Sequence, residues 1–176
     1  MNCLFQKINL SLPNFSIEQL KGDILVEHLH PITNQGVSVY KIADSKVLEL
    51  LTQLAQIANP VISYNEIYGD LEPHRDFGGT CVINYYIDTN DADTIFYTSA
   101  QNASTAIFNH GAEIHTRNNC TEIARFTAEA NSSWILNIGE LHSVTMPTIG
   151  YRRVISIGYP QYDFQTVREK LKALWC

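Results

Sequence analysis

The chain has 176 residues, of which 45% are hydrophobic and 17% are charged, so its composition is that of a globular domain and excludes an extensively disordered protein. Its formal net charge is −6, and no basic stripe runs along it. Because proteins that bind phosphate backbones usually carry such a stripe, nucleic acid is not an expected partner.

Processing signals and linkers are absent from the sequence pattern. The four cysteines, at positions 3, 81, 120 and 176, form neither a CxxC pair nor a disulfide framework, which fits a reduced compartment. The N-terminal residues contain no long apolar run, so we expect a cytoplasmic protein without a signal peptide or a membrane anchor. We expect a single domain over residues 1–176. The sequence does not indicate the oligomeric state.

The first 60 residues combine short strands with one clear helix. Strands are predicted at residues 5–12 and 36–42, with one or two helical turns at 16–21 between them. A helix is predicted over residues 45–58, because apolar side chains recur every three or four positions there, as Val47, Leu48, Leu51, Leu54 and Ile57. Asp44 or Ser45 is a suitable cap, and Asn59-Pro60 ends the helix.

After Pro60 the pattern changes to β-structure. Short apolar segments, separated by Gly, Asn and Asp, predict strands at residues 61–68, 81–87, 94–98, 106–108, 121–127, 133–138 and 153–159. Many short strands at this spacing indicate a sandwich or a barrel. A last amphipathic helix is predicted at 164–175. The expected fold is therefore mainly β, with a barrel core over 61–159 and the two longer helices packed outside it.

Three potential metal ligands follow this β-pattern. His74 and Asp76 form a His-x-Asp sequence, and on extended backbone the side chains of residues i and i+2 point the same way. His142 lies far downstream, just after a strand that looks buried, where a turn could aim it into the barrel. Two imidazoles and one carboxylate make a facial triad that suits iron(II) and leaves coordination positions open.

An arginine pair follows the second histidine. Arg152 comes ten residues after His142, and its guanidinium could bind a carboxylate through two hydrogen bonds. On a strand, Arg152, Val154 and Ser156 share one face, so Ser156 could add a hydroxyl group, and Arg153 points to the other face. The sequence leaves open whether Arg152 or Arg153 binds the carboxylate. The alternative for Arg152 is a surface ion pair, for instance with Glu140.

Further polar residues are candidates for the same pocket. Tyr64 and Asn84 are predicted pocket residues. Tyr68 and Tyr86 are further candidates, although core packing is the commoner role of a tyrosine. His28 and His30 form His-Leu-His, which we interpret as a solvated strand. His110 and His115 are interpreted as loop residues.

The order of these residues resembles a known group. His-x-Asp at 74–76, a long gap, His-Ser-Val at 142–144 and an arginine ten residues after His142 are similar to the iron(II)/2-oxoglutarate-dependent dioxygenase superfamily, especially its small prolyl-hydroxylase-like and phage or bacterial members. The flanking residues 64–73, 81–87 and 94–97 also look similar to that group. The resemblance covers roughly 61–159, and residues 98–132 carry no signature of the superfamily.

The resemblance implies a fold and a function. The fold would be a double-stranded β-helix, a cupin-like jelly-roll barrel. His74, Asp76 and His142 would bind iron, and Arg152 would bind 2-oxoglutarate, with Ser156, Tyr64 and Asn84 in the same cofactor pocket. The protein would then be an oxidoreductase that uses dioxygen to hydroxylate a peptide, a protein side chain or a small molecule. The alternatives are a non-catalytic cupin-like metal- or ligand-binding protein, a hydrolase or isomerase using another divalent metal, and a structural protein with a fortuitous triad.

Overall fold

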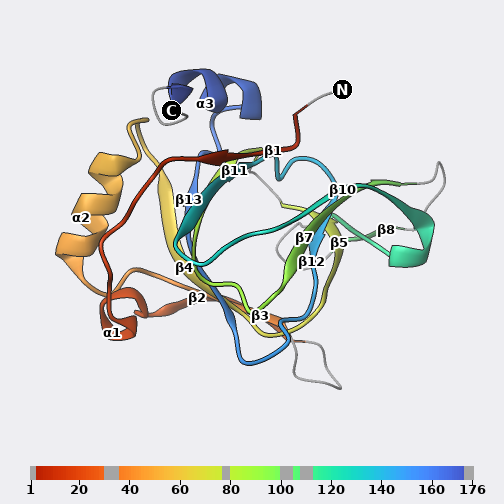
Figure 1. Ribbon diagram of the computed structural model, residues 1–176, viewed down its shortest axis with the longest axis horizontal. Coiled ribbons are helices and arrows are strands. Elements are labelled where there is room, and N and C mark those ends of the chain that lie inside the picture. Colours follow the sequence, from red (N-terminus) through yellow and green to blue (C-terminus); the bar gives the residue numbers. More distant parts are fainter. Residues whose placement is uncertain (1–2, 30–35, 77–79, 100–104, 108–112, 173–176) are drawn as a thin grey trace.

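The computed structural model describes residues 3–29, 36–76, 80–99, 105–107 and 113–172. Within these ranges the chain is mainly β and forms two antiparallel sheets that face each other, with helices on one side (Figure 1). The expectation of a mainly β fold with few helices is confirmed. None of the helices in the described ranges has both the length and the apolar character that a membrane crossing requires.

The described strands divide between a larger and a smaller sheet. In spatial order, the larger sheet consists of β1 (Phe5–Ile8), β11 (Ser132–Leu136), β6 (Val82–Asp88), β13 (Arg152–Gly158), β4 (Val61–Ile67), β3 (Gly36–Tyr40) and β2 (Ile24–Leu29). The smaller sheet consists of β10 (Cys120–Thr127), β7 (Asp93–Ser99), β12 (His142–Val144), β5 (Leu71–Arg75), β9 (Glu113–His115) and β8 (Thr105–Ile107). Strands that are distant in the chain are therefore neighbours in both sheets.

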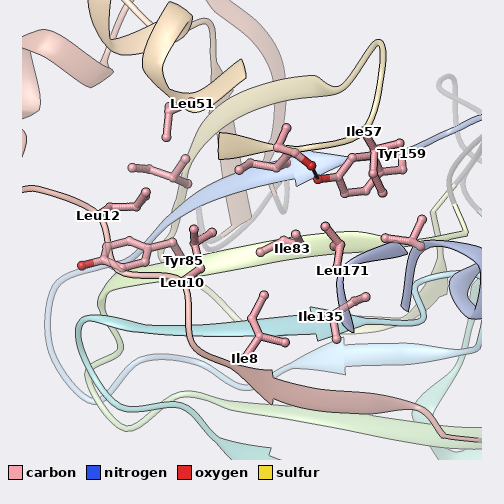
Figure 2. Packing of buried hydrophobic residues seen from close by; sticks show 14 of the residues in the cluster. Ile8, Leu10, Leu12, Leu51, Ile57, Ile83, Tyr85, Ile135, Tyr159 and Leu171 are labelled. Atoms are coloured by element: carbon pink, nitrogen blue, oxygen red, sulfur yellow. Dashed lines mark hydrogen bonds between the residues drawn. The ribbon is translucent and has the colours of Figure 1, made fainter. Parts of the chain in front are cut away.

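The helices cover the outer face of the larger sheet. They are α1 (Ile17–Leu20), α2 (Ser45–Leu54) and α3 (Phe164–Lys170). A short 3-10 turn, η1 (Arg117–Asn119), lies between β9 and β10 in the chain. Leu51 of α2 and Leu171, just after α3, are fully buried against strand residues such as Ile83 and Ile135 (Figure 2). The hydroxyl of Tyr159 donates a hydrogen bond to the carbonyl of Ala55, 2.8 Å away. This outer core fixes the larger sheet from behind.

A second core fills the space between the two sheets. Phe96 and Phe126 of the smaller sheet belong to one buried cluster with four residues of the larger sheet, which are Val82, Tyr86, Leu136 and Val154. Along β6 the residues alternate, because Ile83 and Tyr85 belong to the outer core. The inner faces of both sheets can thus be assigned residue by residue, and the candidate site lies between those faces.

Several element boundaries differ from the predictions. The helix expected over 45–58 ends at Leu54, since Gln56 adopts a left-handed backbone with φ of 55°, although Ile57 beyond it is still buried. The last helix ends at Lys170, and residues 173–175 of the prediction lie outside the described residues. The first strand ends at Ile8, while Leu10 and Leu12 are buried on irregular backbone. Because buried apolar residues continue beyond the ends of the regular elements, the predicted elements were longer than the observed ones.

Candidate metal centre

Two histidines face each other on neighbouring strands of the smaller sheet. His74 on β5 is paired directly with His142 on β12, and the two ring centroids are 4.5 Å apart. On its other side His142 is paired with Phe96, a member of the inner core. Because directly paired residues project from the same face of a sheet, both imidazoles point into the space between the sheets. His142 begins a short strand, which corrects the expectation that a turn would carry it.

Asp76 completes the group from the end of β5. Its backbone N–H donates a hydrogen bond to the carbonyl of Ile138, at 3.3 Å, which ties the end of β5 to the segment that leads into β12. One carboxylate oxygen lies 3.4 Å from Nε2 of His74, and the other lies 3.9 Å from Nε2 of His142. All three possible ligand atoms lie within 4.8 Å of one another. In the described part of the chain, no other three His, Cys, Asp or Glu residues are grouped in this way.

Backbone carbonyls orient both imidazole rings. Nδ1 of His74 lies 2.7 Å from the carbonyl oxygen of Glu72, and Nδ1 of His142 lies 3.0 Å from that of Glu140. A carbonyl can only accept, so each Nδ1 carries the proton and donates it. The lone pair of each neutral ring is then on Nε2, the atom that faces the shared space. Metal-binding histidines are commonly held in this tautomer by the same kind of hydrogen bond.

His142 and Asp76 are ionised as a cation site requires, whereas His74 favours a proton on Nε2 that a bound cation would replace. Burial and the neighbouring His74 lower the pKa of His142 to about 4, so this ring is neutral near pH 7. Burial raises the pKa of Asp76, but the hydrogen bond with His74 and the charges of both rings outweigh it, and the pKa falls to about 2. Burial also opposes protonation of His74, yet its hydrogen bond with Asp76 and the carboxylate charge raise the pKa of that imidazole.

The donor set fits one small divalent cation. Ligand atoms about 2 Å from a shared ion at right angles to one another lie about 3 Å apart, and the distances from the Asp76 oxygens to the two rings are only slightly longer. Two imidazole nitrogens and one carboxylate oxygen on one side leave the other side open. Asp76 is partly exposed, with 45% of its side chain accessible, so the open side can be reached.

Arg152 is buried in the same space without a counter-ion. It is 1% exposed and begins β13. One guanidinium nitrogen, Nη2, donates to Oγ1 of Thr94 at 2.7 Å, and Nη1 donates to the carbonyl of Asp93 at 3.3 Å. Among the described residues no carboxylate forms an ion pair with Arg152, and its Nε–H has no hydrogen-bond partner. The surface ion pair with Glu140 considered for Arg152 is therefore wrong.

Arg153 points to the opposite face of the larger sheet. It forms ion pairs with Asp88, at 2.8 Å, and with the buried Glu66, at 3.8 Å. Glu66 also accepts a hydrogen bond from the hydroxyl of Tyr64 and pairs with Lys21 at 2.7 Å. The alternation of the strand thus separates the two arginines. Arg153 is neutralised on the outer face, whereas Arg152 faces inward and has no carboxylate partner among the described residues.

Tyr86 lies beside Arg152, although the sequence alone gave no reason to prefer it over the other tyrosines. The guanidinium carbon of Arg152 lies 4.7 Å from the centre of its ring. Tyr86 is fully buried, and its hydroxyl has no hydrogen-bond partner among the described residues. An unsatisfied buried hydroxyl is costly, so two orphaned polar atoms, on Tyr86 and Arg152, lie in one interior region. The signal in the sequence was the alternation of Val82, Asn84 and Tyr86 along one strand.

Three residues predicted to share the cofactor pocket are placed differently from one another. Ser156 and Asn84 are hydrogen-bonded to each other at 2.7 Å on the inner face of the larger sheet. Ser156 lies four residues along β13 from Arg152. Tyr64 belongs to the outer core and bonds Glu66, so its prediction as a pocket residue is wrong. Tyr64 and Asn65 are adjacent on β4, so their side chains project from opposite faces of the sheet, and the sequence did not show which of the two faced inward.

The other described histidines, His28 and His115, do not join the group. His28 lies on β2, as expected for a strand residue, while His30 and His110 lie outside the described residues. His115 is not in a loop. It ends β9, is 3% exposed, and its Nε2 lies 2.6 Å from a carboxylate oxygen of Glu113.

Comparison with known proteins assigns no family to this chain. No protein-family model matches the sequence, and no curated protein matches it either. The functional interpretation therefore depends on the geometry of the site and on the residues that form it.

Proposed function

We propose that this chain is an oxygenase that binds iron(II) through His74, Asp76 and His142 and uses 2-oxoglutarate and dioxygen to hydroxylate an organic substrate. The observation that carries the proposal is the buried guanidinium of Arg152, which has no anionic partner among the described residues and lies in the same space as a His-Asp-His group. The triad accounts for the metal, and Arg152 accounts for the choice of co-substrate.

The strand order supports a double-stranded β-helix as the fold. From β4 onward successive strands alternate between the sheets, except that β7 to β10 all lie in the smaller sheet. The larger sheet takes β4, β6, β11 and β13, and the smaller sheet takes β5, β7, β10 and β12. This order supports a jelly roll, because in each sheet the first strand of the set lies beside the last, β4 beside β13 and β5 beside β12. On this proposal β1, β2 and β3 extend the larger sheet, and β8 and β9 extend the smaller one.

Arg152 is suited to bind the far carboxylate of 2-oxoglutarate. An unpaired buried charge is unfavourable, and here neutral oxygens and the ring of Tyr86 compensate for it only in part. A carboxylate would supply the missing negative charge and accept from the free Nε–H. The hydroxyl of Tyr86 could donate a second hydrogen bond to the same carboxylate.

The protein residues would orient and shield the reacting groups. When bound, iron(II) and 2-oxoglutarate together supply the oxidising chemistry. The backbone carbonyls of Glu72 and Glu140 hold the two imidazoles in the tautomer that directs Nε2 toward the metal position. Phe96, whose ring centroid lies 5.9 Å from that of His142, covers the inner side of the site and excludes water there. The exposed side of Asp76 leaves room for a substrate to approach.

Succinate formation tests this function. The protein is incubated in air with iron(II) and 2-oxoglutarate, and succinate is measured over time. We expect the wild-type chain to produce succinate, and His74→Ala to reduce production to the level of free iron. His28→Ala, which removes a histidine from β2 outside the group, is the matched control and should leave production unchanged.

A non-catalytic metal- and ligand-binding protein would give a different result. It would bind iron(II) and 2-oxoglutarate without producing succinate above the level of the His74→Ala variant. That outcome would contradict the oxygenase proposal while leaving the metal site in place. A protein with a fortuitous triad would show the same metal content before and after the His74→Ala substitution.

A further inference from the structure

A row of neutral polar side chains crosses the inner face of the larger sheet. We call it the amide ladder, and it consists of Ser63 and Asn65 on β4, Ser156 on β13 and Asn84 on β6. Oγ of Ser63 donates to Oδ1 of Asn65 at 3.2 Å, and Nδ2 of Asn65 donates to Oγ of Ser156 at 2.6 Å. Oγ of Ser156 then donates to Oδ1 of Asn84 at 2.7 Å.

The strand registers place this row on the inner face. Asn84 alternates along β6 with Val82 and Tyr86, which both belong to the core between the sheets. Ser156 is paired directly with Asn84 on one side and with Ser63 on the other. Directly paired residues share a face, so the whole row is directed toward the smaller sheet, which carries the metal-ligand candidates.

The direction of the hydrogen bonds leaves free donors at one end of the row. The hydroxyl of Ser156 accepts from Asn65 and donates its single proton to Asn84. Both N–H groups of Asn84 have no partner among the described residues, and one N–H of Asn65 is also unused. The row therefore fixes the orientation of the Asn84 amide and presents its N–H groups to a hydrogen-bond acceptor.

The amide ladder is accessible, in contrast to Arg152. All four of its residues are half-buried, whereas Arg152 and Tyr86 are fully buried. Ser156 lies four residues beyond Arg152, which is about 13 Å on extended backbone. A five-carbon diacid whose far carboxylate is bound at Arg152 is too short to reach the ladder. Ser156 and Asn84, predicted to bind the co-substrate, are thus better placed to contact a substrate.

The ladder lies on the same side of the inter-sheet space as the open side of the metal group. Arg152 contacts Thr94 of β7, and Phe96, two residues further along β7, is level with His142. Val154, two residues beyond Arg152, shares the inner core with Phe96. Ser156 lies two residues beyond Val154 on β13. Asp76 lies two residues beyond His74, just after the end of β5. The ladder thus faces the partly exposed end of the site.

We infer that the amide ladder binds the substrate by donating hydrogen bonds from Asn84 to a carbonyl oxygen of an uncharged, amide-bearing molecule such as a peptide. The ladder contains no charged side chain, so a carboxylate or a phosphate would gain no ion pair there. The role as a substrate site depends on the proposed function, whereas amide binding at Asn84 does not.

Nuclear magnetic resonance of side-chain amides tests the inference in metal-free protein. The probe is N-acetylglycine N-methylamide, an uncharged molecule with two peptide groups, and the matched anion is N-acetylglycinate. We expect the diamide to shift the Asn84 side-chain N–H signals in a saturable way, and the anion to bind more weakly. Asn84→Asp keeps the shape and the acceptor for Ser156 but removes the donors, so it should weaken diamide binding about tenfold or more.

Controls separate this inference from the proposed function. Asn118→Asp makes the same chemical change at an exposed asparagine and should leave diamide binding unchanged. Chemical denaturation establishes that Asn84→Asp is folded. The inference is overturned if the diamide shifts no ladder signal, or if the anion binds more tightly. It is also overturned if 2-oxoglutarate, added with zinc(II) in place of iron, shifts the Asn84 signals. In each case succinate formation can still be observed, so the proposed function is judged separately.

Discussion

At the scale of single residues, strand alternation gives adjacent side chains different environments. Arg152 and Arg153 have the same chemistry and are neighbours in the chain. Arg153 is neutralised by Asp88 and Glu66 on the outer face, while Arg152 is buried inside without a carboxylate partner among the described residues. One residue of register therefore separates a structural ion pair from a candidate anion-binding group.

The two arginines provide a matched pair of substitutions. Lysine keeps the positive charge but lacks the Nε–H and the planar fork. We expect Arg152→Lys to raise the Kd for 2-oxoglutarate about tenfold or more, because the carboxylate loses its second hydrogen bond. Arg153→Lys should leave that Kd unchanged. Calorimetric titration with zinc(II) present measures both constants, and equal effects of the two substitutions would contradict the assignment of Arg152.

At the scale of elements, the outer core holds the larger sheet in place. Helix α2 begins at Ser45, where Oδ1 of Asp44 accepts hydrogen bonds from the backbone N–H groups of Lys46, at 2.8 Å, and Val47, at 3.3 Å. One face of the helix is buried against the sheet, and the residues that project from that face, Val47 and Leu51, are 5% and 0% exposed. The helix stabilises the scaffold from the side opposite to the metal group.

Truncating this face should destabilise the fold without altering the site. Leu51→Ala leaves a cavity in the outer core, and we expect it to lower the free energy of unfolding by about 2–5 kcal/mol. Leu48→Ala, on the same helix but 40% exposed, is the matched control and should cost much less. Urea denaturation measures both changes. A similar loss for the two variants would show that α2 does not pack as described.

The sequence predicted the strongly patterned elements and missed those defined by their neighbours. Segments such as 153–159 have an apolar pattern of their own, and the strand there runs from Arg152 to Gly158. β12 and β9 have three residues each, too few for a period, and they exist because β5 lies between them. The orientation of Tyr64 was wrong for a related reason. Polar or aromatic residues lie on both faces of β4, with Tyr64 and Glu66 on one and Ser63 and Asn65 on the other, so alternation alone did not identify the inner face.

For the candidate site, spacing in the sequence was sufficient to choose the three potential ligands but not to show how they are held. The pairing of His142 with His74 is a contact between residues 68 positions apart in the chain, and only the sheet reveals it. The orphaned hydroxyl of Tyr86 likewise depends on burial, which is a property of the folded chain.

At the scale of the whole molecule, the site connects distant parts of the chain. His74 and Asp76 come from one segment and His142 from another within the smaller sheet, and Arg152 belongs to the larger sheet. A metal that binds the first three joins two segments of the smaller sheet. A co-substrate held by the metal and by Arg152 joins the two sheets. Ligand binding should therefore stabilise the folded state as a whole.

Thermal unfolding measures this coupling. At a free ligand concentration of 100 times the Kd, binding to the folded state alone contributes about 2.7 kcal/mol, so zinc(II) should raise the Tm by several degrees. 2-Oxoglutarate should raise it further only when the metal is present. A chelator should reverse both effects, and His74→Ala should abolish them. An equal rise in the His74→Ala variant would mean that the metal binds elsewhere.

The most direct test of the central claim, that one site holds iron(II) and 2-oxoglutarate together, is an anaerobic titration followed by visible absorption. Iron(II) and then 2-oxoglutarate are added to metal-free protein, with His74→Ala as the comparison. We predict a weak charge-transfer band of the chelate in the wild-type protein and no band in the variant. Absence of the band from folded wild-type protein, with both ligands in excess, would contradict the assignment of His74, Asp76, His142 and Arg152 to an oxygenase site.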